Sequence, residues 1–375
     1  MATAQQAEMR KRQAELGQFF TPTPVAEFMA SLFAPLPPTV RLLDPGAGSG
    51  ALTAAFVSEM CRRRNEVCAI EVTTYEIDSR LQHSLLATMR LCQRLCLESG
   101  IRFTFSMHES DFIQEIAPQL AQELFAGKPP RFDAAVANPP YRKISNESAE
   151  RRALISIGVE TSNLYAGFVA VIQRLLADGG QMVCITPRSF CNGPYFQPFR
   201  ERLLREMELR RLHVFESRSA AFRQDKVLQE NVVFHAVKGP RVPTDVVISV
   251  SSGREGDRVS ETVVPFSDVV HPDDPEKFIH LPVAPEHLVA KELLGSLRST
   301  LAALGVNVST GPVVDFRLKH SIRRVPEKGT VPLLYPCHFS GGAVRWPKLD
   351  ARKPDAIIED DETRRWLIPS GVYVL

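Results

Sequence analysis

The tetrapeptide Asn138-Pro139-Pro140-Tyr141 has residue types suited to chemistry on an amine, and it directly follows the apolar run 132–137. The Asn138 amide oxygen and the Pro139 carbonyl can each accept one N–H of an exocyclic amino group on a base. The two prolines stiffen the turn and remove two competing backbone donors. Holding both amine protons localises the nitrogen lone pair, so the motif predicts methylation of a base nitrogen by positioning. Tyr141 can stack on that base or pack in the core.

A glycine-rich segment, 44–50, lies between a predicted strand at 39–43 and a predicted helix at 51–62. Its spacing differs from that of dinucleotide-binding loops, and no Gly-Lys-Ser/Thr follows, so the sequence predicts no phosphate cradle. Glu76 ends the next strand, where a carboxylate can accept hydrogen bonds from both ribose hydroxyls of a nucleoside. The alternative is that Glu76 is a solvated surface residue. We therefore expect a nucleoside without phosphates, such as S-adenosyl-L-methionine. Its expected contacts here are Asp44, Gly46, Ala47, Gly48 and Glu76.

Asp111 follows a third predicted strand, at 102–107, and has two open interpretations. Its carboxylate can accept from the adenine amino group of the cofactor, with Phe112 and Ile77 packing the ring. It can equally cap the helix that follows.

Short apolar runs alternate with amphipathic helical patterns over residues 1–239, which predicts an α/β domain with a doubly wound, mostly parallel sheet. Ligands in such sheets bind at the carboxyl ends of the strands, where all of these sites lie. The composition changes near residue 240. We expect 240–375 to be a second, less regular α+β domain.

The overall composition is that of a globular protein, with a formal net charge of +2. The sequence has no apolar stretch long enough to span a membrane and no signal-peptide core. The seven scattered cysteines suggest free thiols in a reducing, cytoplasmic compartment. Cys92, Cys96 and His83 lack zinc spacing, so we expect a helix face and no metal site.

A basic stretch lies between Asp315 and Lys353, with nine basic and three acidic residues and therefore a net charge of +6. Such a stretch suits a phosphate backbone, or it is a solvated surface. We expect Arg317, Lys319, Arg323 and Arg324 to contact DNA phosphates, which position a duplex without specifying its sequence.

Three segments in this order, 17–24, 44–50 and 138–141, together resemble the gamma class (TaqI type) of adenine-N6 DNA methyltransferases. The resemblance covers about residues 17–237 and implies the class I S-adenosylmethionine-dependent methyltransferase fold. It places Thr21 and Pro22 at the cofactor tail and Phe168, from the segment 163–168, near the cofactor adenine. It also places Phe222 on the target base. The region 305–375 more loosely resembles the recognition domain of PstI-like members, which usually continue further.

The resemblance implies methylation of adenine N6 in duplex DNA, on a flipped-out base, within a restriction–modification system. About 16 residues precede the first motif, so we expect no fused nuclease there and either a separate cognate restriction endonuclease or none. The segment Val372–Leu375 resembles an interrupted strand, so we expect a fragment whose recognition domain, 240–375, is truncated. The alternative is a methyltransferase of RNA or of protein glutamine, because an amide nitrogen poses the same problem of a delocalised lone pair. A third alternative is a DNA-binding module without activity.

Overall fold

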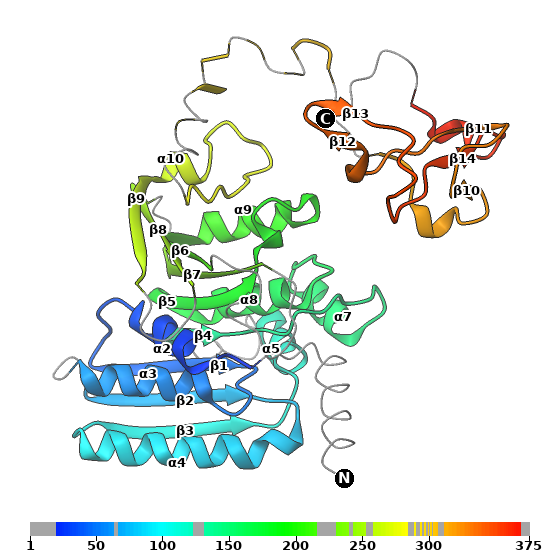
Figure 1. The fold of residues 1–375 in the computed structure, drawn as a ribbon. Coiled ribbons are helices and arrows are strands. Elements are labelled where there is room, and N and C mark those ends of the chain that lie inside the picture. Colours follow the sequence, from blue (N-terminus) through cyan, green and yellow to red (C-terminus); the bar gives the residue numbers. More distant parts are fainter. Residues whose placement is uncertain are drawn as a thin grey trace. The chain divides into compact units, whose positions relative to one another are not determined.

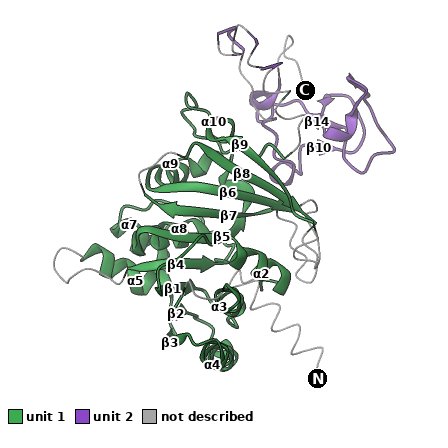
Figure 2. Ribbon diagram, turned by 90° about the vertical axis from the view of Figure 1, so that its left-hand side faces the viewer, with its two compact units in different colours: residues 1–292 green, residues 293–375 purple. Residues whose placement is uncertain are grey.

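The computed structural model describes residues 20–63, 67–122, 131–215, 230–239, 243–252, 258–283 and 311–368, with isolated positions between 289 and 306. The chain divides into two compact units, residues 1–292 and residues 293–375, shown in different colours in Figure 2. Unit 1 contains the large sheet, and unit 2 contains short strands. Within the described residues, no helix is both long and apolar enough to cross a membrane.

A nine-stranded sheet in the order β3-β2-β1-β4-β5-β7-β6-β8-β9 forms the framework of unit 1 (Figure 1). Strands β3, β2, β1, β4 and β5 are parallel to one another, whereas β7 is antiparallel to both β5 and β6. The predicted doubly wound, mostly parallel sheet is therefore confirmed. Its strands are β1 (Thr39–Pro45), β2 (Ala69–Tyr75), β3 (Arg102–His108), β4 (Phe132–Ala137), β5 (Leu176–Pro187), β6 (Met207–Phe215), β7 (Asn231–Lys238), β8 (Asp245–Ser251) and β9 (Ser260–Pro265).

Helices cover both faces of this sheet, and Figure 2 shows α2 and α3 on one side and α5, α7, α8 and α9 on the other. Each face has its own hydrophobic core, because alternate strand residues point to opposite faces. Helix α8 is buried along almost its whole length, as its continuous apolar sequence requires. The helices are α2 (Thr23–Ser31), α3 (Ala51–Arg62), α4 (Gln82–Glu98), α5 (Phe112–Ala121), α7 (Ala149–Ser156), α8 (Leu164–Leu175), α9 (Gln197–Glu206) and α10 (Phe266–Val269).

Gly50 makes the turn that joins β1 to α3. Its φ is +87°, a left-handed conformation that favours glycine, and it is the residue before the first turn of α3. A Cβ atom at this position would lie 3.0 Å from Leu85 and from Thr88 of α4. Gly50 therefore lets α4 pack closely against the start of α3.

The first compact unit extends beyond the predicted boundary at residue 239. Strands β8 and β9 are antiparallel to each other, and β8 also pairs in parallel with β6. The two strands thus continue the large sheet, and the division into units falls after Glu292. Sequence patterning misses this because an edge hairpin has the same alternation whichever sheet it joins.

Unit 2 is built on a small three-stranded sheet in the order β10-β14-β11 and a two-stranded hairpin, β12-β13. A fully buried hydrogen bond supports it, in which His338 Nε2 lies 2.8 Å from Asp355 Oδ1. The apolar core contains Leu318, Leu333 and Ile357. The strands are β10 (Ile322–Arg323), β11 (Thr330–Pro332), β12 (Phe339–Ser340), β13 (Ala343–Val344) and β14 (Ala356–Ile358).

Candidate functional site

A cleft that is partly open to solvent lies at the carboxyl ends of the parallel strands in unit 1. It receives residues that follow β1, β2, β3 and β4, together with the start of α8. The sequence predicted this convergence, because the carboxyl ends of parallel strands meet at one edge. The lining residues are Phe20, Gly46, Gly48, Tyr75, Glu76, Ile77, Ser110, Asp111, Phe112, Asn138, Pro140, Arg142, Leu164 and Phe168.

The Glu76 carboxylate is fixed in the cleft by backbone donors. Glu76 is 2% exposed, and its two oxygens accept from the backbone N–H groups of Gly48 at 2.8 Å and Asp78 at 2.7 Å. Gly48 has a φ of +59°, which turns its N–H toward the carboxylate at no steric cost. Each carboxylate oxygen has a second lone pair, so Glu76 can also accept from ligand hydroxyl groups.

Aromatic rings form one wall of the cleft beside Asp111. The Phe112 and Phe168 rings are 5.3 Å apart, and Phe112 also lies 5.1 Å from Tyr75. The Ile77 side chain is 49% exposed and lines the same cleft. An apolar slot of this kind suits a flat ring, as expected for the cofactor adenine.

Asp111 shows that its two interpretations are compatible. Its Oδ1 accepts from the backbone N–H of Gln114 at 2.8 Å and so caps α5. The residue nevertheless lines the cleft, and burial raises the pKa of its carboxyl group. The helix cap is thus confirmed, whereas its contact with an adenine amino group stays a prediction.

Asn138 follows the last residue of β4, and Thr21 lies directly beside it. The Asn138 amide Nδ2 donates to Thr21 Oγ1 at 3.0 Å, although the two residues are 117 positions apart in the chain. This contact gives the amide a defined orientation, with its nitrogen toward Thr21. The resemblance placed Thr21 at the cofactor tail. In the structure Thr21 accepts from Asn138 and is not among the lining residues, and Pro22 is the N-cap residue of α2. Their contacts with the cofactor stay predictions.

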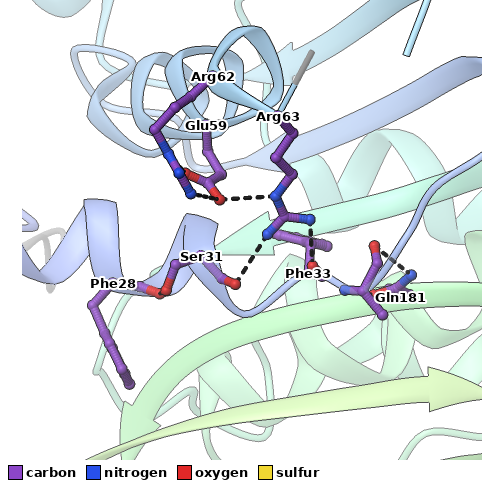
Figure 3. Close-up of polar contacts among 8 residues, drawn as sticks. Phe28, Ser31, Phe33, Glu59, Arg62, Arg63 and Gln181 are labelled. Carbon is purple, nitrogen blue, oxygen red and sulfur yellow. Dashed lines mark hydrogen bonds and ion pairs between the residues drawn. The ribbon is translucent and has the colours of Figure 1, made fainter. Parts of the chain in front are cut away.

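The helix that carries Thr21 and Pro22 to the site is anchored at its opposite end. Figure 3 shows Arg63, the C-cap residue of α3, joining Glu59 to the end of α2. The Arg63 guanidinium donates to the carbonyls of Phe33 at 2.6 Å and Ser31 at 3.0 Å. The Gln181 amide of β5 accepts from the Ala34 N–H at 2.8 Å. Helix α2 is thereby held against α3 and β5.

The remaining members of the 138–141 motif lie behind the cleft wall, with the exception of Pro140, which lines it. Tyr141 is half-buried, and its hydroxyl donates to the Ile185 carbonyl at 3.3 Å. Burial raises the pKa of Tyr141 well above its usual range, so the phenol stays neutral. Pro139 is buried and is not part of the lining. The roles predicted for Pro139 and Tyr141 stay predictions, and Phe222 lies outside the described residues.

Asp44 and Ala47 are not among the lining residues of the cleft, and their contacts with the cofactor stay predictions. Asp44 is fully buried, and its Oδ2 accepts from the Thr53 hydroxyl of α3 at 2.6 Å. Burial raises the pKa of this carboxyl group to about 7. The geometry therefore gives Asp44 a supporting position beneath the glycine segment.

Several lining residues had not been predicted. Phe20 was part of the quoted 17–24 segment, and its ring lies 3.6 Å from the position of a Cβ on Gly48. Arg142 pairs with Glu150 of α7 at 2.5 Å and follows the tetrapeptide directly. Both residues lie in or directly beside a motif that the sequence analysis had recognised, and this position could have predicted them. The other unpredicted lining residues are Tyr75, Ser110, Pro140 and Leu164.

The four basic residues predicted to contact DNA fall into two groups. Arg324 donates to the carbonyls of Ala351 and Arg352, and Arg323 pairs with Glu327 at 2.8 Å, so both are used within the unit. Arg317 and Lys319 are exposed and have no ion-pair partner among the residues that the structure describes. All four phosphate contacts stay predictions, and the geometry favours the second group.

The cleft fits S-adenosylmethionine, since it combines a buried carboxylate, a close-approach glycine turn and an apolar slot. The fit needs no metal ligands. In the described part of the chain, no group of three or more His, Cys, Asp or Glu residues could hold a metal ion.

Comparisons with known proteins identify methyltransferases that are similar to this chain. The family model described as Eco57I restriction-modification methylase matches residues 73–222. The type II methyltransferase M.BsuBI of Bacillus subtilis is 42% identical over 97% of this chain and 72% of its own length. The type II methyltransferase M.PstI of Providencia stuartii is 39% identical over 96% of this chain and 70% of its own length.

One solved structure supports the fold. It comes from a type I R-M system, is 14% identical with a TM-score of 0.54, and is matched over 77% of this chain and 66% of that chain. The predicted class I S-adenosylmethionine-dependent methyltransferase fold is confirmed, with its strand order as described.

Proposed function

Because the chain belongs to the type II restriction–modification methyltransferase family, we propose that it methylates adenine N6 in duplex DNA, using S-adenosylmethionine. The observation that carries the proposal is the position of Asn138. This residue shares one cleft with Glu76 and Gly48, and its amide nitrogen is turned toward Thr21. The proposed reaction uses the other end of this amide, the oxygen Oδ1 of Asn138, as an acceptor for the target amine.

The residues proposed to hold the cofactor are those of the cleft wall. Glu76 accepts from the ribose hydroxyls, Gly48 allows close backbone approach, and Phe112 with Phe168 packs the adenine ring. Asp111 and Ile77 border the same ring, and Gly46 lines the turn beside Phe168. When bound, S-adenosylmethionine supplies an electrophilic methyl group on a sulfonium.

The protein's own contribution to the reaction is the positioning of the amine. Asn138 Oδ1 and the Pro139 carbonyl each accept one N6–H, which localises a lone pair that is otherwise delocalised into the ring. Pro139 and Pro140 have no N–H that would compete for these acceptors. No covalent enzyme intermediate is required, since orientation alone lowers the barrier.

The base must leave the duplex to reach this cleft. A stacked and paired adenine presents its amine to its partner base, so the enzyme must extrude the whole nucleotide. Tyr141 is proposed to stack on the extruded ring, and Phe222 to stack on it as well. Residues 240–375 are proposed to bind the flanking DNA, with Arg317 and Lys319 on phosphates.

The test measures transfer of tritiated methyl groups to duplex DNA, followed by mass spectrometry of the released nucleosides. We expect N6-methyladenine from the wild type and none from Asn138→Ala, which should still bind S-adenosylmethionine. Asn138→Asp is the matched control, because it keeps an acceptor oxygen and should retain partial activity. If methyl groups were transferred to RNA or to protein glutamine and none to DNA, the proposed function would be wrong. The chain would then be a methyltransferase of RNA or of protein glutamine.

A further inference from the structure

We infer that Asn231 is a second base-recognition residue, whose side-chain amide donates to a ring nitrogen of the extruded base. The inference rests on the proposed function and deepens it, since it concerns how the same site selects its base. Asn231 is the first residue of β7.

The sheet register brings Asn231 to the edge and the face occupied by Asn138. Ala137 of β4 pairs with Cys184 of β5, and Pro187 of β5 pairs with Asn231 of β7. Both asparagines therefore lie at the carboxyl end of β5, one on each side of it. They are two strand spacings apart across the sheet and two residues apart along β5, or roughly 12 Å.

Side-chain alternation assigns the face. Val136 of β4 and Val233 of β7 belong to the same hydrophobic core, the one beneath α2. Asn138 and Asn231 are each two residues away from these valines, so both lie on this face. Thr21, at the start of α2, lies on the same face against Asn138.

The Asn231 amide is buried, and the described part of the chain offers it no hydrogen bond. The residue is 5% exposed, and neither its Nδ2 nor its Oδ1 has a hydrogen-bond partner among the described residues. Burying an amide without hydrogen bonds is costly, so such a group in a native fold calls for an explanation. A substrate group that enters at this edge supplies one.

The surroundings hold Asn231 in place. The backbone N–H of Arg188, next after β5, donates to the Glu230 carbonyl at 2.7 Å, and the Arg188 guanidinium pairs with the Glu230 carboxylate at 3.0 Å. The residue before Asn231 is thus tied to the end of β5.

The chemistry of adenine then assigns the partner atoms. Asn138 and Pro139 take both N6 protons, so the base presents only ring nitrogens, which are acceptors. Of the two polar atoms of the Asn231 amide, only Nδ2 is a donor. Asparagine is also a residue that pairs well with adenine edges.

The experiment compares adenine with 1-deaza-, 3-deaza- and 7-deazaadenine at the target position of a duplex. The target is first located by sequencing DNA methylated in a methylation-free host. For the wild type we expect one analogue to lower kcat/KM about tenfold, as for the loss of one hydrogen bond. In Asn231→Ala, adenine and that analogue should react alike.

Two further variants keep the outcome interpretable. Asn231→Asp has nearly the same size but no N–H donor, so it should lose the same discrimination if Asn231→Ala does not fold. Gln173→Ala is the matched control, because Gln173 is a fully buried amide of α8 that also lacks a described partner. It should keep the wild-type response to every analogue.

The results separate the two levels of the proposal. If the wild type methylates adenine but the Asn231 variants respond to every analogue as the wild type does, the role of Asn231 is refuted alone. A wild type insensitive to all three analogues refutes it as well. If the wild type transfers no methyl group to any DNA, the proposed function itself fails.

Discussion

Replacing Thr21 by valine should slow methyl transfer while leaving the cofactor bound. Valine has nearly the shape of threonine but lacks the oxygen that accepts from Asn138 Nδ2 at 3.0 Å. The variant therefore removes one hydrogen bond from an amide whose orientation matters for the reaction. Thr21→Ser keeps the hydroxyl and serves as the matched control.

The expected magnitude follows from that single bond. A hydrogen bond lost from a partly buried amide costs about 1–2 kcal/mol, which corresponds to a rate decrease of roughly 5- to 30-fold. The decrease should appear in the chemical step, because Thr21 does not line the cleft where the cofactor is proposed to bind.

The assay is single-turnover methyl transfer at saturating S-adenosylmethionine, with the cofactor Kd measured separately by calorimetry. Thr21→Val should show the slower rate with an unchanged Kd, and Thr21→Ser should resemble the wild type. A weaker cofactor affinity with an unchanged chemical step would refute the reasoning, and it would assign Thr21 to the cofactor tail as the family resemblance implies.

Three further outcomes are expected. Glu76→Gln should weaken S-adenosylmethionine binding at least about tenfold in calorimetry, because an amide loses the charge-assisted bonds to ribose hydroxyls; an unchanged Kd would exclude the ribose role. Arg317→Gln should reduce the slope of log K against log salt for DNA binding by about 0.9. Arg324→Gln should leave this slope unchanged and instead increase amide hydrogen exchange near residues 351–353, because Arg324 donates to backbone carbonyls there. The reverse pattern would contradict the division of these arginines into two groups. Burial lowers the pKa of His235 from 6.5 to about 4. Between these pH values the unfolded chain binds the proton more readily than the folded chain does. The free energy of unfolding should therefore fall by about 3 kcal/mol as the pH drops from 6.5 to 4. His235→Gln should lack this part of the pH dependence in urea titrations, and an identical dependence would disprove the assignment.

The sequence determined the local chemistry of the site because each motif is continuous in the chain. The glycine turn, Glu76, Asp111 and Asn138 all follow apolar runs, and the parallel order of those runs places their ends at one edge. The convergence of these residues in one cleft could therefore be predicted without a structure. The cap formed by Asp111 was also readable from its place before a helical pattern.

Only the tertiary structure decided which side chains meet across the fold. The contact between Thr21 and Asn138 joins residues 117 positions apart, and the register across β5 places Asn231 at the same edge. The burial of Asp44 and the use of Arg324 on backbone carbonyls depend equally on packing. The physical reason is that local patterns state a residue's type and periodicity, whereas its partners are fixed by strand order and register, which distant segments set together.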